Sequence, residues 1–355
     1  MTLRTIAFYL PQFHPTPEND EWWGKGFTEW ANVAKAKPLF RDHYQPHLPG
    51  DLGFYDLRLP EVREAQAALA RSYGITGFCY HHYWFGGKRM LERPFEEVLN
   101  SKKPDFPFCL SWANESWSRT WTSEFSSAEI LLDQTYSSED DRRHIQYLIT
   151  AFKDKRYIRV NGRPLFLIYK VNHIGDRMTE MLKTWREELK IAGIEGLYLV
   201  SVRSPPPPGF ETSVDFFPGA GHYPTRPRIV NSLNYRLSKL FSRSRSKHKI
   251  YKYAEIVDHM LEKPHPEFKQ FYCPVPGWDN TARRTAAGAL ILHDSTPESF
   301  ETWVKFCVEQ TKRRFSGEEQ ILFINAWNEW AEGCHLEPDQ KWGHEYLSAL
   351  ERAIT

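Results

Sequence analysis

The sequence lacks the features that define several large classes of protein. It has no run of about 18 apolar residues, the length that a membrane-spanning helix requires. Its formal net charge is +1, so no overall field favours a nucleic-acid partner, and none is expected. The N-terminal residues "MTLRTIAFYLPQF" enter a strand-like pattern directly, without the apolar core and cleavage site of a signal peptide. We therefore expect a cytoplasmic protein.

Motifs for cofactors, nucleophiles and metals are also missing. Neither G-x-G-x-x-G nor G-x-x-x-x-G-K-[ST] occurs, and the G-x-S-x-G elbow of many serine hydrolases is absent. The adjacent pairs His81–His82 and Cys334–His335 do not have the i, i+4 or C-x-x-C spacing that lets two ligands converge on zinc. There is no D-x-D motif of the kind that anchors a nucleotide-sugar diphosphate through a metal. The sequence therefore predicts a site without metal or cofactor.

Aromatic residues, in contrast, are abundant. They make up 15% of the 355 residues and include 13 Trp, 17 Tyr and 23 Phe. Aromatic faces stack on the apolar C–H faces of sugar rings, so carbohydrate clefts are often rich in them. A large aromatic core would give the same composition, and composition alone does not separate the two interpretations.

Short strand-like runs alternate with helical patterns along the whole chain, which is typical of βα units around a parallel sheet. The expected strands are 4–10, 74–82, 106–112, 163–170, 196–202, a weak 214–219, 270–278 and 321–327. The expected helices include 60–73, 138–155, 176–192, 251–263, 297–315 and 343–353. Eight strands predict an α/β fold, a (β/α)8 TIM barrel with long βα loops. The alternative, a doubly wound sheet, should show a Gly-rich turn after its first strand, where this chain has "PQFHPTPENDEWWG".

We expect residues 1–355 to form a single catalytic barrel domain with a basic insertion at about 203–250. Six aromatic and charged segments follow predicted strands: "EWWGKGFTEW", "HHYWFGG", "SWANESWSRTW", "GAGHYP", "GWDNTARR" and "AWNEWAEG". In a barrel the loops after the strands build the active face. These segments therefore predict one functional rim.

Two carboxylates at the end of the last predicted strand are the best catalytic candidates. Glycosidic cleavage needs an acid for the leaving oxygen and a second carboxylate that generates or acts as the nucleophile. Glu329 and Glu332 lie beside Trp327 and Trp330, whose rings can raise a carboxyl pKa by desolvation. In a continuing strand the two would point to opposite faces, but the "AEG" bend can turn both into the barrel mouth. The alternative is that one of them is a solvent-exposed or salt-bridged loop residue.

The remaining candidates are expected to bind substrate, although each is also compatible with a purely structural role. They are Glu29, Trp30, His81, His82, Tyr83, Trp84, Trp112, Asn114, Glu115, Trp117, Arg119, Tyr169, His222, Tyr223, Trp278, Asp279, Trp327, Asn328 and Trp330.

One stretch, 226–252, is strongly basic and has apolar residues at i, i+4, i+7 and i+8. A solvated insertion is one interpretation. A weak contact with an anionic membrane surface, or with an anionic glycan, is the other.

The segments "AFYLPQFHPTPENDEWWGKGFTEWANVAKAKPLF", "HHYWFGGKRMLERPFEEVL", "LSWANESWSRTW", "PGWDNTARR" and "INAWNEWAEGCHLEPD" together resemble the WbsX-like family. That family is often labelled as glycosyltransferases of surface-polysaccharide gene clusters. It is related to glycoside hydrolase family 99, the endo-α-mannosidase and mannanase barrels. The resemblance covers nearly the whole chain, and the 203–250 insertion is its least recognisable part.

The resemblance implies roles for the two glutamates, because family 99 uses two carboxylates in a W-N-E-W-x-E-G-like motif at the end of strand eight. Glu329 would assist the substrate's own 2-hydroxyl in attacking the anomeric carbon through an anhydro-sugar intermediate. Glu332 would protonate the departing oxygen and later activate water, with net retention. A 2-hydroxyl can displace the leaving group only when the two are trans, as in α-manno and α-rhamno sugars.

The resulting prediction is a retaining, endo-acting glycoside hydrolase or transglycosylase. Its expected substrate contains α-linked mannose- or rhamnose-type residues, in a bacterial surface polysaccharide or an oligosaccharide. One alternative is a glycosyltransferase of O-antigen or capsule biosynthesis. Another is a non-catalytic carbohydrate-binding barrel.

Overall fold

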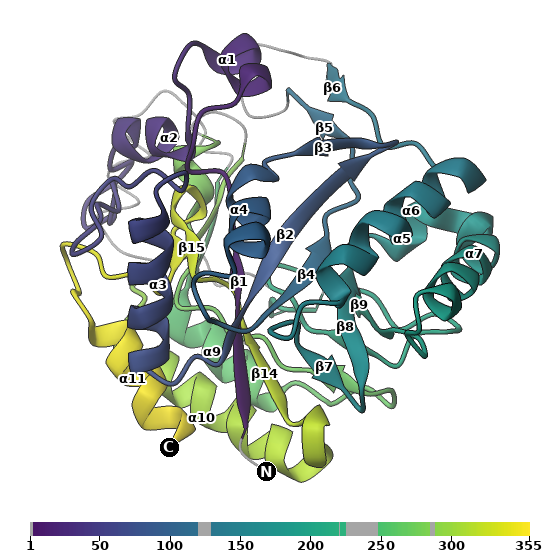
Figure 1. The fold of residues 1–355 in the computed structure, drawn as a ribbon. Coiled ribbons are helices and arrows are strands. Elements are labelled where there is room, and N and C mark those ends of the chain that lie inside the picture. Colours follow the sequence, from purple (N-terminus) through teal and green to yellow (C-terminus); the bar gives the residue numbers. More distant parts are fainter. Residues whose placement is uncertain (1–2, 120–128, 220, 225–247, 285–287) are drawn as a thin grey trace.

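The computed structural model describes residues 3–119, 129–219, 221–224, 248–284 and 288–355. Its centre is a nearly closed barrel of eight parallel strands (Figure 1). In sheet order the strands are β12 (Gln270–Phe271), β10 (Thr212–Val214), β9 (Tyr198–Val202), β8 (Arg163–Ile168), β4 (Phe108–Trp112), β2 (Gly77–Phe85), β1 (Arg4–Tyr9) and β14 (Ile321–Ile324). The Phe323 and Asn325 amides donate to the Tyr272 and Pro274 carbonyls, which brings the last strand back to the β12 segment. The predicted (β/α)8 barrel is confirmed.

Helices cover the outside of the barrel, as the sequence pattern predicts. They are α3 (Pro60–Ser72), α4 (Arg93–Ser101), α5 (Ser138–Phe152), α6 (Val171–Ile174), α7 (Met178–Ile191), α9 (Tyr253–Glu262), α10 (Pro297–Arg314) and α11 (Glu345–Ile354). All six expected helices form. The α10 helix begins at a Thr296 cap, whose hydroxyl accepts from the Ser299 amide, followed by Pro297 in the first turn. Residues 203–211 join β9 to β10 without a helix.

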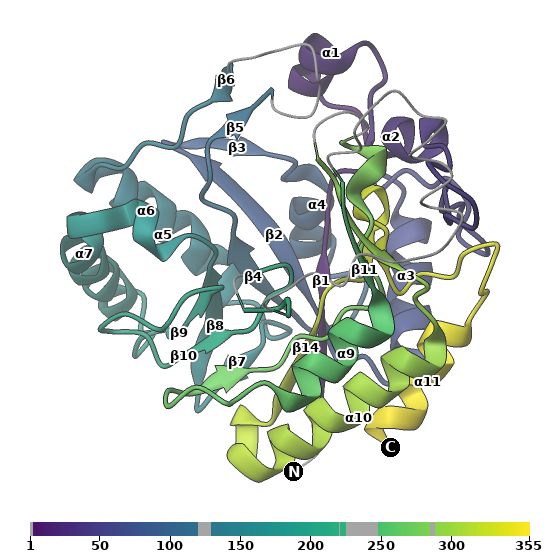
Figure 2. The same cartoon turned by 180° about the vertical axis from the view of Figure 1, so that it is seen from behind.

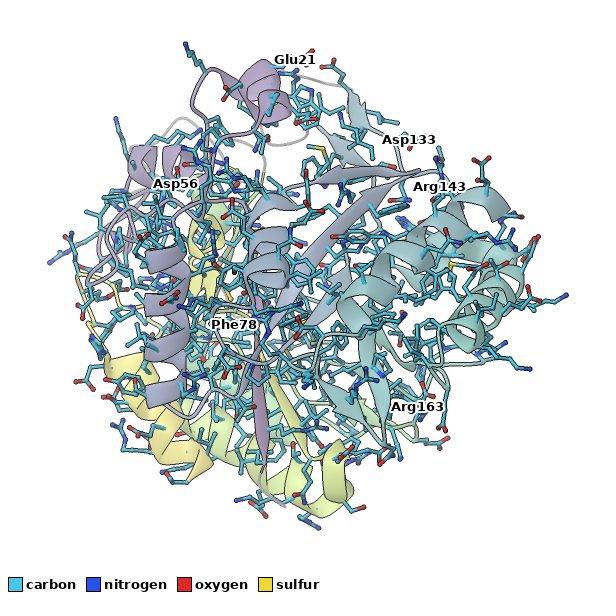
Figure 3. All side chains as sticks on the ribbon, in the orientation of Figure 1. Glu21, Asp56, Phe78, Asp133, Arg143 and Arg163 are labelled. Carbon is cyan, nitrogen blue, oxygen red and sulfur yellow. The ribbon has the colours of Figure 1, made fainter. Side chains whose placement is uncertain are left out.

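Two layers of side chains hold the barrel together, and strand register separates them. Phe8 pairs with Cys79 and Cys79 pairs with Cys109, so these three side chains share the inner face. Phe8 also packs edge-on to Phe216 and beside Phe323, which closes the interior. Phe78, on the opposite face of β2, is buried near the middle of the molecule (Figure 3).

The loops after the strands gather at one end of the barrel. This end carries α1 (Pro17–Trp23), α2 (Glu29–Lys35), β3 (Lys88–Met90) and the hairpin of β5 (Trp117–Ser118) with β6 (Ile130–Leu132) (Figures 1 and 2). The chain termini lie at the other end. Glu21 on α1 and Arg163 at the start of β8 mark these two ends in Figure 3.

The parallel pair β11 (Lys249–Lys252) and β13 (Leu290–His293) joins the rim beside the turn η2 (Asn280–Ala282). The short pair β15 (Asn328–Glu329) and β16 (Cys334–His335) encloses the turn η4 (Trp330–Glu332). The rim is therefore built from long loops with small sheets of their own.

Candidate active site

The alternation of side chains along β2 divides the HHYWF segment between two environments. His81 and Tyr83 point into the barrel mouth, where both line a large cavity. His82 and Trp84 point outward, toward α5: the His82 ring nitrogen lies 2.9 Å from that of His144, and the Trp84 indole donates to Asp140 at 3.0 Å. Only alternate residues of this strand can therefore meet a ligand in the barrel mouth.

The cavity has a volume of about 760 Å³ and opens at the C-terminal ends of the strands. The predicted residues that line it are His81, Tyr83, Glu115, Trp117, Tyr169, Tyr223, Trp278, Glu329 and Glu332. Trp22 of α1 also lines it, and its ring meets that of Trp117 edge to face with centroids 6.0 Å apart. Tyr83 meets the same indole at 5.2 Å, so the three rings form an aromatic wall of the kind that sugar rings stack on.

Glu329 and Glu332 face the same cavity because of the local backbone. The turn η4 is a 3-10 helix, in which residues three apart are eclipsed. Glu329 caps this turn and Glu332 ends it, so both side chains project to one side. Gly333 follows in a left-handed conformation, with φ of 58°, and a Cβ there would lie 3.0 Å from the Asp279 backbone nitrogen. The motif therefore converts a strand end into a pair of converging carboxylates.

Arg283 holds three carboxylates together. Its Nη2 donates to Glu329 Oε2 at 3.1 Å, its Nη1 lies 3.0 Å from Glu332 Oε1, and its Nε donates to Glu29 Oε2 at 3.0 Å. Glu29 is completely buried and Glu329 is 8% exposed. We call Glu29, Arg283, Glu329 and Glu332 the carboxylate cluster. Arg283 was not among the residues predicted to act, although it lies in the "GWDNTARR" segment.

The carboxylate cluster has three acidic groups and only one guanidinium, and the pKa of Glu329 is raised. Burial raises the pKa of Glu329 to about 8; Arg283 opposes the rise, and Glu332 and Glu29 add to it. Glu329 is therefore mainly protonated in the free protein at neutral pH. Burial lowers the pKa of His81 to about 4, so the ring 4.0 Å from Glu329 is neutral.

A comparison of the sequence with known families decides its membership. Residues 5–350 match the family described as "Glycosyltransferase WbsX". The chain belongs to the WbsX family. It is 39% identical over 358 residues to "Uncharacterized protein WxcX" of Xanthomonas campestris pv. campestris strain B100, and to the protein of the same name in strain ATCC 33913. Each match covers 99% of this chain and 49% of the relative, so the chain spans about half the length of these relatives.

Two solved structures share the fold of this WbsX-family chain. A "Glycoside hydrolase-like protein" matches with a TM-score of 0.58 and 13% identity, over 100% of this chain and 94% of the other. The GH99 endo-alpha-mannosidase from Bacteroides thetaiotaomicron matches with a TM-score of 0.56 and 14% identity, over 99% and 95%. At these identities the likeness concerns the fold. It agrees with the relationship to family 99 that the motifs predicted.

In the WbsX-family motif at 325–338, three predicted residues build the loop instead of lining the cavity: Trp327, Asn328 and Trp330. Asn328 accepts from the Leu10 amide at 2.7 Å and donates back to the Leu10 carbonyl at 3.0 Å. The Trp330 indole donates to Glu337 at 2.6 Å, and Tyr55 donates to the same carboxylate oxygen at 2.8 Å. Trp327 is fully buried against Phe78. These contacts fix the position from which Glu329 and Glu332 project.

Several other predicted residues support rim segments. Trp30 donates to the Tyr55 carbonyl at 2.8 Å, and Asn114 joins two loops by bonding both the amide and the carbonyl of Lys170. The Trp112 indole donates to the Trp84 carbonyl at 3.2 Å.

The charged residues among the remaining predicted positions are paired. Arg119 pairs with Glu129 at 2.9 Å, and His222 pairs with Asp215 at 2.7 Å. Asp279 caps η2 through Thr281 and contacts His43 at 2.6 Å. Their assignment as substrate ligands stays a prediction.

The basic stretch 226–252 lies largely outside the described residues, and its predicted amphipathic helix falls entirely within 225–247. Its end forms β11 on the cavity rim. In the described parts of the chain, no helix combines the length and the apolar character needed to cross a membrane.

Proposed function

We propose that this protein is a retaining glycosidase or transglycosylase that cleaves α-linked, manno-configured sugar residues within an oligosaccharide or polysaccharide. The observation that carries the proposal is the pair Glu329 and Glu332, which project from one 3-10 turn into a cavity of about 760 Å³ with an aromatic wall. Glycosidic cleavage requires a pair of carboxylates, one as acid and the other as base or nucleophile, and this pair supports the proposal. The proposal includes endo action, in which the sugar chain extends on both sides of the cleaved bond.

In the proposed mechanism Glu332 protonates the departing glycosidic oxygen and later activates water. Its side chain is 20% exposed, twice the exposure of the Glu329 side chain, which suits contact with a leaving group that faces solvent. Glu329 takes the proton of the substrate 2-hydroxyl as that oxygen attacks the anomeric carbon. Arg283 stabilises the ionised form of Glu329 during this step, because its Nη2 already contacts that carboxylate.

The main test is a pair of isosteric substitutions, Glu329→Gln and Glu332→Gln, assayed on a panel of α-mannose- and α-rhamnose-containing oligosaccharides. Each should lower turnover by about 10²–10⁴-fold, the usual contribution of a positioned acid or base. Glu309→Gln, on the exposed face of α10, is the matched control and should leave turnover unchanged. Near-normal turnover in both cavity variants, with intact circular dichroism, would refute the assignment.

The pH profile separates the roles of the two glutamates. If Glu329 is the base, kcat/KM should rise with pH up to about 8, because the carboxyl must lose its proton first. A profile that falls over this interval would instead assign Glu329 as the proton donor. Nuclear magnetic resonance of the first-formed anomer tests retention independently.

A second candidate, a glycosyltransferase, is favoured by the family description and by one feature of the cavity. Arg203, Lys249 and Arg284 line the cavity in addition to Arg283, and their charges could face the phosphate of an activated donor. Incubation with nucleotide- or lipid-linked sugars in parallel with oligosaccharides distinguishes the functions. Consumption of the activated donor alone would favour transfer.

A further inference from the structure

A second polar cluster lies behind the carboxylate loop, outside the cavity already described. It consists of His47, from the long segment after β1, and His335 and Asp339, from the segment after η4. One ligand atom of each residue lies within 4.8 Å of the other two. The His47 Nδ1 and His335 Nε2 atoms are 2.9 Å apart, and His335 Nε2 lies 3.9 Å from Asp339 Oδ2.

The other polar atoms of His335 and Asp339 are already engaged. His335 Nδ1 donates to the Glu337 carbonyl at 3.0 Å, so the proton of the neutral ring is on Nδ1 and Nε2 carries a lone pair. Asp339 Oδ1 accepts from the amides of Lys341 and Trp342, at 3.0 and 2.6 Å, which leaves Oδ2 facing His335. This is the outer bonding that orients histidine and carboxylate ligands around a metal.

Few donors serve the two acceptors of this cluster: His47 Nδ1 lies 2.9 Å from His335 Nε2, and the Tyr44 hydroxyl bonds Asp339. The His335 lone pair and the Asp339 carboxylate oxygen are both acceptors, and their 3.9 Å separation is too long for a hydrogen bond between them. Both residues are buried, at 6% and 4% exposure, so water does not screen the repulsion. A proton of His47 can be shared with only one of the two acceptors at a time.

The backbone holds the three side chains in place. The Gly50 amide donates to the Pro338 carbonyl at 2.7 Å, and the Gln340 amide donates to the Leu48 carbonyl at 2.9 Å. The two segments are thus hydrogen-bonded on both sides of the cluster.

Aromatic rings pack against both imidazoles. The Tyr44 ring stacks on His47 with centroids 4.1 Å apart, and the Trp330 indole stacks on His335 at 3.7 Å. The Lys341 ammonium lies over the Tyr44 and Trp342 rings, at 4.5 and 4.8 Å. The ligand set is therefore pre-organised.

The chemistry of the donors indicates which metal would bind. Two imidazole nitrogens and one carboxylate oxygen are a borderline set that suits zinc. A cavity of about 60 Å³ borders all three residues, which leaves room for a water molecule as fourth ligand.

We propose that His47, His335 and Asp339 bind one zinc ion, which ties the segment after β1 to the loop that carries Glu332. The ion would fix His335, three residues after Glu332, and with it the Trp330 indole that stacks on its ring. The role is structural, and it stands whether the protein proves to be a hydrolase, a transferase or a binding protein. It revises the sequence-based expectation of a site without metal.

The test is zinc binding by the full chain with its purification tag removed. After equilibration with zinc chloride and dialysis against a weak chelator, elemental analysis should find about one zinc per chain. The cobalt(II)-loaded protein should show the intense visible absorption of a tetrahedral site. Zinc should also raise the melting temperature of the wild-type protein.

Two variants and a control complete the experiment. His47→Gln and Asp339→Asn should each weaken zinc binding by at least about tenfold, as measured by calorimetry. His344→Gln removes a partly exposed histidine that is likewise paired with an aspartate, Asp51, and should bind zinc like the wild type. Less than about a tenth of a zinc per wild-type chain, or equal binding by all variants, would overturn the proposal. Because wild-type stoichiometry and the cobalt spectrum do not depend on the variants, misfolding of a variant leaves the test decisive.

Discussion

The substitution Glu329→Gln should stabilise the protein even as it removes activity. Glu29, Glu329 and Glu332 share a single guanidinium, so full ionisation places three negative charges around one positive charge in a largely buried site. Glutamine keeps the shape of the protonated glutamate and never acquires the third negative charge. The variant therefore isolates the cost of ionising Glu329 inside the folded protein.

The magnitude follows from the pKa of Glu329, which is raised from 4.5 to about 8. Between these values the folded state binds a proton that the unfolded state has lost, so the stability of the wild type falls as pH rises. Each pH unit corresponds to about 1.4 kcal/mol. The loss reaches about 3 kcal/mol at pH 7 and levels off at roughly 5 kcal/mol above pH 8. Below about pH 4.5 both states hold the proton, and the difference disappears.

Urea unfolding of the wild type and the Glu329→Gln variant at half-unit steps from about pH 5 to pH 9, followed by circular dichroism, measures this difference. The free energy of unfolding of the variant should exceed that of the wild type by an amount that grows with pH and levels off above pH 8. Glu309→Gln, at an exposed position, should follow the wild-type curve. If the curves of wild type and Glu329→Gln run parallel over the whole interval, Glu329 does not hold the proton and the electrostatic reasoning is refuted.

Three further outcomes test the surroundings of the site. Arg283→Met should lower the free energy of unfolding by about 3–5 kcal/mol at pH 8, because it leaves buried carboxylates without their shared cation. Urea unfolding measures this change. A loss under about 1 kcal/mol would contradict the role assigned to this ion pair. Trp117→Ala should raise KM for a long oligosaccharide by about tenfold with a smaller change in kcat, since it removes a stacking face of the cavity wall. Glu337→Gln should lower the free energy of unfolding by about 1–3 kcal/mol, because an amide nitrogen would then face one of the donors Tyr55, Gln66 and Trp330. An unchanged melting temperature would contradict this prediction.

The fold could be predicted from the sequence because the barrel repeats one simple unit. Each of the eight expected strands overlaps a strand of the barrel, and 4–10 becomes Arg4–Tyr9, but 321–327 shortens to Ile321–Ile324 and 270–278 to Gln270–Phe271. The strands with weaker patterns are shorter or displaced, as for 214–219, which becomes Thr212–Val214. Here tertiary pairing decides the strand, since β10 is set by its neighbours β9 and β12 and not by its own composition. The extent of the domain remains a prediction.

The site could be predicted only in part, and the reasons are physical. Alternation along β2 was readable in the sequence and would have separated His81 and Tyr83 from His82 and Trp84. No local pattern predicts Arg283, because its role depends on meeting Glu29, 254 residues away, at the centre of the rim. The His47 cluster was missed for the same reason, since its ligands come from segments that only the barrel brings together.

The indoles near Glu329 show how far composition can mislead about a cleft. The sequence predicts that Trp327 and Trp330 bind substrate, but both are buried in the core. Their surroundings explain the arrangement: the 3-10 turn aims two carboxylates in one direction, and packing supports its other side. The Trp330 bond to Glu337 and its stacking on His335 supply that support, while the aromatic faces open to the cavity come from other segments, at Trp22, Tyr83 and Trp117. In this loop aromatic residues therefore position the carboxylates, and a zinc ion at His335 would stiffen the same support from behind.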